Sequence, residues 1–249
     1  MKIISIINQK GGIAKSSTVN VLSEGLTLKK YKTLAIDLDP QCNLTYSMGG
    51  DFNNSSIFEV LSGKAKAKDV IQKLKISDLI ASNKELSGAD ITFNKTGKEY
   101  LLKERIEELK KEYDYIIIDT PPNLGILTIN ALVASDKVII PSQANIFSLQ
   151  GVENLISTID LIKKYCNNKL QIQGILITKF KERTILNNEV ADMLKKLAKQ
   201  LNTKVFSSRI REAIAIQEAQ IKQMGLFDYA PNSNVAEDYR LFIKEFLKG

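Results

Sequence analysis

Residues 2–17 of the chain read KIISIINQKGGIAKSS, and this stretch decides the fold. Its first part, Lys2–Asn8, is an almost continuous apolar run, which is typical of a strand buried on both faces of a sheet. Its second part, Gln9–Ser17, holds two adjacent glycines followed by a lysine and a serine, and it leads into a helix expected over Lys15–Lys30. A strand, a glycine-containing loop and a helix in this order indicate a loop that binds phosphate.

The loop departs from the P-loop pattern G-x-x-x-x-G-K-[ST] because Gln9 and Ala14 replace its two glycines, whereas Lys15 and Ser16 hold their places. Backbone N–H groups at a helix N-terminus bind phosphate, and the glycine pair lets the backbone approach it closely. We expect Lys15 to reach the β- and γ-phosphates of a nucleotide and the Ser16 hydroxyl to coordinate Mg²⁺. The alternative is a turn capped by serines before an ordinary helix.

The rest of the chain alternates β-branched runs with segments of helical period. Further strands are expected over Thr33–Asp39, Tyr115–Asp119, Lys137–Pro141 and Gln171–Thr178. Further helices are expected over Lys98–Tyr113, Gly125–Ala134, Ser148–Tyr165, Thr184–Leu201 and Ala236–Leu247. This alternation predicts one α/β domain over residues 1–249, with a mostly parallel β-sheet flanked by helices. Ligands of such sheets bind beyond the carboxyl ends of the strands.

Carboxylates stand at two of these strand ends. The second strand closes with Asp37-Leu38-Asp39-Pro40-Gln41, and the third with Asp119-Thr120-Pro121-Pro122. A carboxylate at the end of a buried strand is costly to desolvate unless it meets a cation or hydrogen-bond donors. Three such groups beside a phosphate loop suit a Mg²⁺-nucleotide site, although each could instead cap the helix that follows it.

The composition excludes several other classes of protein. With 44% hydrophobic and 25% charged residues among 249, the chain is that of an ordinary globular protein. The absence of histidine excludes catalysis by imidazole, and two cysteines provide neither a disulfide framework nor the usual zinc spacing. The first apolar stretch is too short for a signal peptide, so we expect a cytoplasmic protein. The net charge of +7 favours contact with polyanions.

The motifs resemble those of the deviant Walker A ATPases of the ParA/MinD group. The resemblance rests on Lys10-Gly11-Gly12-x-x-Lys15-Ser16, on the Asp37 to Gln41 element and on the Asp119 to Pro122 element. Later stretches are similar to the C-terminal third of ParA-type partition proteins, namely Ile210-Arg211-Glu212-Ala213, Glu218-Ala219-Gln220 and Glu237-Asp238-Tyr239. Because the chain begins at its first strand, we expect it to lack the helix-turn-helix extension of the larger partition ATPases.

The resemblance implies an ATP hydrolase with ATP and Mg²⁺ as cofactors. Lys10 matches the lysine that crosses a nucleotide-sandwich dimer to the partner's phosphates, Lys15 is the P-loop lysine, and Asp39 matches the carboxylate that positions the attacking water. Ser16, Asp37 and Asp119 stand where the family supports Mg²⁺. The nucleotide-binding residues implied in this way are Lys10, Gly11, Gly12, Ile13, Ala14, Lys15, Ser16 and Ser17.

The chain also departs from the family pattern. Ala14 replaces the usual glycine before the P-loop lysine, so the local backbone must suit a residue with a Cβ atom. Many relatives carry Ile-Pro-Arg near the adenine pocket, whereas the matching stretch Phe206-Ser207-Ser208 has no proline. The residues that contact the base are therefore not identified by the resemblance.

The resemblance further implies partners. These are a second copy of the chain on ATP binding, a ParB-like centromere-binding protein that stimulates hydrolysis, and non-specific double-stranded DNA. Binding to DNA would place the ATP-bound form on the nucleoid, and the cycle would serve plasmid or chromosome segregation. The candidates for DNA contact are Lys181, Arg183, Lys195, Lys199, Arg209 and Arg211. The alternative is that these residues form a solvated helix face.

Two other functions compete with partition. In a MinD-like membrane-cycling ATPase the amphipathic segment 236–247 would bind lipid, but its acidic residues weaken that interaction, and we expect core packing instead. A non-catalytic regulatory scaffold would keep the fold alone. The joint presence of Lys10, Lys15, Asp39 and Asp119 argues against the scaffold.

Overall fold

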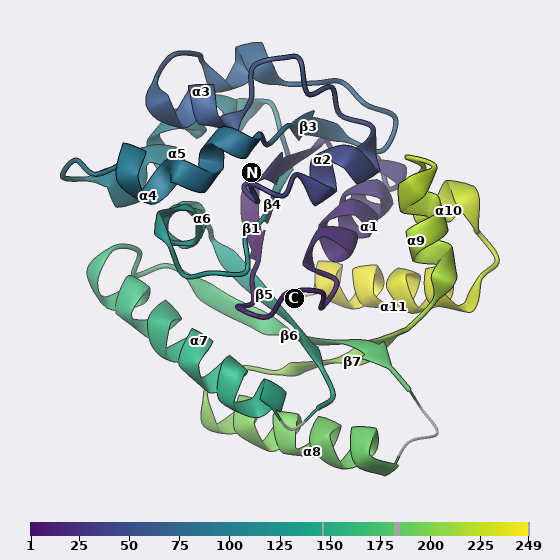
Figure 1. Cartoon of the computed structure of the whole chain (residues 1–249). Helices are drawn as coiled ribbons and strands as arrows, with labels where there is room; N and C mark the ends of the chain where they lie inside the picture. Colours follow the sequence, from purple (N-terminus) through teal and green to yellow (C-terminus); the bar gives the residue numbers. More distant parts are fainter. Residues whose placement is uncertain (146, 182–184, 249) are drawn as a thin grey trace.

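The computed structural model describes residues 1–145, 147–181 and 185–248. Within these ranges seven strands form one parallel sheet in the order β3-β2-β4-β1-β5-β6-β7 (Figure 1). The strands are β1 (Lys2–Ile6), β2 (Thr33–Asp37), β3 (Asp78–Ile80), β4 (Tyr115–Asp119), β5 (Lys137–Gln143), β6 (Gln171–Phe180) and β7 (Val205–Arg211). The predicted α/β fold and its five strands are confirmed, with ends that differ by at most two residues.

Helices cover both faces of the sheet (Figure 1). One face carries α1 (Lys15–Leu28), α2 (Asn43–Met48), α9 (Ile214–Ile221), α10 (Leu226–Tyr229) and α11 (Asn234–Lys248). The other carries α3 (Ile57–Ser62), α4 (Ala89–Thr92), α5 (Leu101–Arg105), α6 (Ile126–Ala134), α7 (Phe147–Tyr165) and α8 (Ile185–Gln200). Short 3₁₀ turns lie at Ala67–Val70, Lys84–Gly88, Lys98–Tyr100 and Glu107–Lys111.

The central position of β1 explains why the N-terminal sequence is almost continuously apolar. Ile4 and Ile6 pack into the core beneath α1 and α11, whereas Ile3 and Ile7 pack into the core on the opposite face. Because both faces are covered, neither set of alternating side chains meets water. β1 lies between β4 and β5, so the loop that follows it opens at the middle of the sheet.

The helix predicted over Lys98–Tyr113 is wrong as a single element. The segment forms α5 between two 3₁₀ turns, although its predicted apolar positions, such as Leu102, are buried. The side chain of Asn130 in α6 explains why the first turn of the segment is not α-helical. Its Oδ1 accepts from the Leu102 N–H at 2.9 Å, and its Nδ2 donates to the Lys98 carbonyl at 2.8 Å. These two backbone groups would otherwise bond to each other in a continuous helix.

The C-terminal helix packs as expected. Tyr239, Phe242 and Phe246 of α11 lie in the core beneath the sheet, so its apolar face is covered by the protein itself. In the described part of the chain no helix combines the length and apolarity that crossing a bilayer requires. The predicted helix start at Thr184 lies outside the described residues.

Candidate nucleotide site

The loop between β1 and α1 is held by the neighbouring strands. The Asn8 side chain donates to the Pro141 carbonyl of β5 at 2.7 Å and accepts from the Lys10 N–H at 3.0 Å. The Thr178 hydroxyl of β6 donates to the Ile13 carbonyl at 2.9 Å. The backbone path of the loop is therefore fixed by the sheet rather than by the loop alone.

Two residues of this loop adopt left-handed backbone conformations. Gly12 has a φ of 71° and Ala14 a φ of 70°. Ala14 is the residue before α1, and its carbonyl accepts from both the N–H and the hydroxyl of Thr18. A Cβ atom at such a φ costs about 1 kcal/mol, so the departure from glycine noted in the sequence is accommodated with strain. The side chain of this N-cap residue makes no hydrogen bond to the first N–H groups of α1. These N–H groups are therefore available to bind an anion.

The two lysines of the loop occupy different places. Lys15 is 7% exposed, and its Nζ donates to the Lys10 carbonyl at 3.4 Å. Burial lowers the pKa of Lys15, and the carboxylates of Asp119 and Asp39 act in the opposite direction. Lys10 is exposed, and its Nζ donates to the Gln143 side chain at 3.3 Å. Lys15 thus lies inside the site and Lys10 at its outer surface.

Asp119 ends β4 with one carboxylate oxygen unsatisfied. The residue is fully buried, its Oδ1 accepts from the Thr120 N–H at 3.0 Å, and its Oδ2 has no hydrogen-bond partner. Burial raises the pKa of Asp119 well above its ordinary value, and the negative charge of the neighbouring Asp37 raises it further. The Ser16 side chain and the positive charge of Lys15 lower this pKa, but by less. A buried oxygen without a partner is what a bound cation would satisfy, so the site fits Mg²⁺.

The protein alone does not complete a metal site. Among the residues described, no three His, Cys, Asp or Glu side chains are arranged to hold an ion. Phosphate oxygens and the Ser16 hydroxyl would therefore have to supply further ligands, as Mg²⁺ in nucleotide sites requires.

Asp37 and Asp39 are held differently. Asp37 is fully buried and accepts from the Asp39 N–H at 3.0 Å and from the N–H and hydroxyl of Thr45 at 2.9 and 2.8 Å. Burial raises the pKa of Asp37 to about 6, although these hydrogen bonds lower it. Asp39 is 6% exposed, and its Oδ1 accepts from the Gln41 N–H at 2.9 Å.

A cavity of about 520 Å³ adjoins the loop. Its walls come from the P-loop, α2, the ends of β6 and β7, and α9. They include Gly12, Lys15, Tyr46, Lys179, Ile210, Arg211, Ala213, Ile216 and Gln220. The Gln220 side chain of α9 also donates to the Ser17 hydroxyl at 3.0 Å. The sequence analysis singles out the stretch from Ile210 to Ala213 but assigns it no role. It does not predict that α2 and α9 lie next to the loop, because only the tertiary fold brings them there.

The candidates for DNA contact lie on different elements of the structure. Lys195 and Lys199 are exposed on α8, where Lys195 pairs with Asp192 at 2.9 Å. Lys181 forms an ion pair with Glu212 at 3.3 Å. Arg183 lies outside the described residues.

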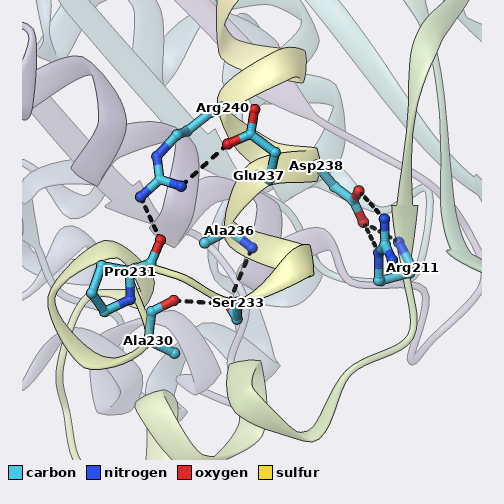
Figure 2. A network of polar contacts seen from close by, with 8 residues as sticks. All are labelled: Arg211, Ala230, Pro231, Ser233, Ala236, Glu237, Asp238 and Arg240. Atoms are coloured by element: carbon cyan, nitrogen blue, oxygen red, sulfur yellow. Dashed lines mark hydrogen bonds and ion pairs between the residues drawn. The ribbon is translucent and has the colours of Figure 1, made fainter.

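The two arginines of β7 make contacts within the protein. The Arg209 guanidinium lies over the Phe180 ring, 4.4 Å from its centroid, and donates to the Asn188 side chain at 3.3 Å. Figure 2 shows Arg211 directed at Asp238 of α11, to which it donates from Nε at 2.7 Å. The sequence therefore groups residues that differ in their surroundings, with the α8 lysines turned to solvent and Arg211 engaged by α11.

Comparison with known proteins identifies relatives over almost the whole chain. The family described as AAA domain matches residues 1–172. The chain is 37% identical to the sporulation initiation inhibitor protein Soj of Bacillus subtilis over 249 residues, which are 98% of this chain and 97% of that protein. It is 32% identical to the chromosome partitioning protein ParA of Myxococcus xanthus, over 99% of this chain and 88% of that protein.

Solved structures with nucleotide are similar in fold. Cobyrinic acid a,c-diamide synthase from Mycobacterium smegmatis, with bound ATP analogue and magnesium, matches with a TM-score of 0.88 and 30% identity, over 100% of this chain and 94% of that one. A putative plasmid partition protein from Borrelia burgdorferi bound to AMPPNP matches with a TM-score of 0.83 and 28% identity, over 99% and 98%. The extent of these similarities, together with the geometry of the P-loop, shows that the chain belongs to the ParA/Soj family of partition ATPases.

Proposed function

We propose that this chain binds Mg-ATP at the loop between β1 and α1 and hydrolyses it to drive the segregation of a plasmid or chromosome. The observation that carries the proposal is the unpartnered, fully buried Oδ2 of Asp119 in the same site as the buried amine of Lys15. A carboxylate and an ammonium group that are both removed from water suit a ligand that brings a cation and phosphate charge together.

Each residue has a role in this proposal. Lys15 neutralises the β- and γ-phosphates, and Ser16 and Asp119 hold Mg²⁺ together with phosphate oxygens. Bound Mg²⁺ supplies charge neutralisation on the transferred phosphoryl group. Asp39 orients the attacking water. The α2, β7 and α9 walls of the 520 Å³ cavity receive the nucleoside.

We further propose that ATP binding assembles a homodimer. Lys10 is exposed at the outer edge of the loop, where its amine contacts Gln143, so it is accessible to the phosphates of a second copy. Hydrolysis would then depend on assembly, which suits a switch. The ATP-bound dimer would bind non-specific DNA through basic residues of the C-terminal half, and a ParB-like partner would stimulate hydrolysis. In the cell this corresponds to a cytoplasmic protein that associates with the nucleoid while ATP is bound.

ATP turnover tests the catalytic part of the proposal. We expect Lys15→Ala and Asp39→Ala to lower kcat on the order of 100-fold, because positioning and charge neutralisation supply most of the catalysis of phosphoryl transfer. Lys103→Ala is the control, since Lys103 is exposed on α5, outside the nucleotide cavity. Full turnover by Lys15→Ala would contradict the assignment of the site.

Binding to random-sequence duplex DNA tests the partition part. We expect binding with ATP, little with ADP or without nucleotide, and a marked loss between two salt concentrations. The MinD-like alternative predicts ATP-dependent flotation with anionic liposomes. That experiment needs the full chain, because the apolar face of α11 belongs to the core and its removal would expose the residues it covers.

A further inference from the structure

A closed circuit of hydrogen bonds surrounds the segment that carries Asp39. The hydroxyl of Thr45 in α2 donates to Asp37 Oδ2 at 2.8 Å and accepts from the Ser82 N–H at 2.9 Å. The Ser82 hydroxyl donates to the Asp39 carbonyl at 2.7 Å. The Asp39 N–H donates to Asp37 Oδ1 at 3.0 Å and closes the circuit.

This circuit is almost inaccessible to bulk solvent. Asp37 and Thr45 are fully buried, Ser82 is 1% exposed and Asp39 is 6% exposed. Hydrogen bonds in such surroundings are electrostatically stronger than in water, and a member that loses its partner carries the full cost of desolvation. The circuit also joins three separate parts of the chain, since Asp37 ends β2, Thr45 lies in α2 and Ser82 follows the edge strand β3.

The two buried carboxylates therefore differ in what they can do. Asp37 accepts three hydrogen bonds from Asp39 and Thr45, whereas Asp119 keeps Oδ2 without a partner. Asp119 therefore has an oxygen available to a cation, whereas the oxygens of Asp37 are already bonded and hold the backbone of the loop after β2.

We propose that Thr45 and Ser82 are positioning residues for ATP hydrolysis, which act by holding Asp39 through its backbone and through Asp37. This inference rests on the proposed ATPase function. Thr45, Ser82, Asp37 and Asp39 are all absent from the lining of the nucleotide cavity. The circuit therefore affects the rate of hydrolysis more than the affinity for Mg-ATP, since a small displacement of a positioned group costs rate without removing a binding contact.

The test compares Thr45→Val with Thr45→Ser. Valine keeps the shape of threonine but has no hydroxyl, whereas serine keeps the hydroxyl and loses only a methyl group. We expect Thr45→Val to lower kcat about tenfold or more while the Kd for Mg-ATP changes less than about threefold. Thr45→Ser should restore kcat to within about twofold of the wild type.

Ser82→Ala provides a milder second variant. It removes the bond to the Asp39 carbonyl and the contact of the Ser82 hydroxyl with the Cys42 thiol. The Asp39 carbonyl still accepts from the Cys42 N–H at 2.9 Å, so the fold has a remaining constraint there. We expect a smaller loss of kcat, about threefold, again with Kd preserved. The matched control is Ser77→Ala, since Ser77 is also buried and precedes β3, but its hydroxyl contacts only the Asp78 carbonyl at 3.2 Å.

The outcomes separate the two proposals. A merely structural role would lower the melting temperature of the Thr45 and Ser82 variants, as we expect for Ser77→Ala, and would leave kcat per folded molecule unchanged. That result overturns the inference, while wild-type turnover upholds the ATPase. A wild type that binds Mg-ATP without turning it over overturns both. Loss of kcat that Thr45→Ser reverses, with Kd unchanged, supports the positioning role. Should Thr45→Val not fold, the kcat and Kd of Ser82→Ala decide by the same criteria.

Discussion

Asp238 of α11 binds both the backbone and the side chain of Arg211 at the last residue of β7. Its Oδ2 accepts from the Arg211 N–H at 3.0 Å and from Nε at 2.7 Å, and its Oδ1 accepts from the second terminal nitrogen at 2.8 Å (Figure 2). The carboxylate is 9% exposed. Arg211 lies where β7 gives way to the segment that lines the nucleotide cavity, so α11 fixes one wall of that cavity.

Asp238→Asn should therefore weaken both the fold and nucleotide binding. An amide keeps one acceptor but loses the charge, and we expect the free energy of unfolding to fall by about 1–3 kcal/mol because the group is nearly buried. The Kd for an ATP analogue should rise with it. The neighbouring pair Arg240 and Glu237 is the control, since both side chains are exposed and Glu237→Gln should cost about 0.5 kcal/mol or less. Equal effects of the two changes would contradict the role assigned to Asp238.

Ala14→Gly should stabilise the chain. Ala14 has a φ of 70°, which glycine adopts without the steric cost of a Cβ atom. Part of that gain is offset by the greater entropy of glycine in the unfolded chain, so we expect a net gain of about 0.5–1 kcal/mol in denaturant unfolding. At Ala213, where φ is −151°, the same substitution offers no relief and should destabilise.

The sequence predicts the centre of this fold better than its edges. β1, β2 and β4 are mostly apolar because both faces are covered, and such runs stand out in a sequence. The edge strand β3 has only three residues, and β7 interrupts its apolar residues with two serines and two arginines, so neither carries that pattern. The prediction of one helix after Gly97 fails in its first turn because the side chain of Asn130, which lies in another helix, binds two of its backbone groups.

The same distinction applies to the site. Lys15, Asp37 and Asp119 stand out in the sequence because they are end residues of elements at the carboxyl edge of the sheet: Lys15 begins α1, and Asp37 and Asp119 end β2 and β4. Thr45 and Ser82 cannot, since only the folded chain brings their hydroxyls to the loop that carries Asp39. The structure likewise shows that Asp37 accepts three hydrogen bonds whereas Oδ2 of Asp119 has no partner, a difference that the sequence spacing leaves open.

A buried glutamate makes stability depend on pH. Glu24 of α1 is 5% exposed and accepts from the N–H groups of Phe227 and Asp228 at the start of α10, at 3.1 and 3.3 Å. Burial raises the pKa of Glu24 to about 7, more than these hydrogen bonds lower it. Gly225 leaves room for the carboxylate, since a Cβ atom there would lie 2.0 Å from Glu24 Oε1.

The sign of the effect follows from proton binding. Between pH 4.5 and about 7 the folded chain holds a proton on Glu24 that the unfolded chain has released, so Glu24 makes stability fall as pH rises through this range. The whole contribution is roughly 3 kcal/mol. We expect Glu24→Gln to reduce the decline in unfolding free energy measured between pH 5 and pH 8, because the amide does not titrate. Glu153→Gln on exposed α7 should leave it unchanged; identical pH curves for wild type and Glu24→Gln would refute this assignment.

The lysines of α8 should determine the electrostatics of DNA binding. Lys195 and Lys199 are exposed on one helix, whereas Arg211 is bound to Asp238, so we expect the lysines to carry more of the phosphate contact. Replacing both lysines with glutamate should lower the affinity of the ATP-bound protein for random duplex about tenfold or more, and reduce the slope of log affinity against log salt by about 1–2. The control is the pair Lys103→Glu and Lys111→Glu, which changes the net charge equally at exposed positions outside α8. If both pairs weaken binding to the same extent, net charge rather than an α8 surface explains the interaction, and if neither does, the DNA surface lies elsewhere on the chain.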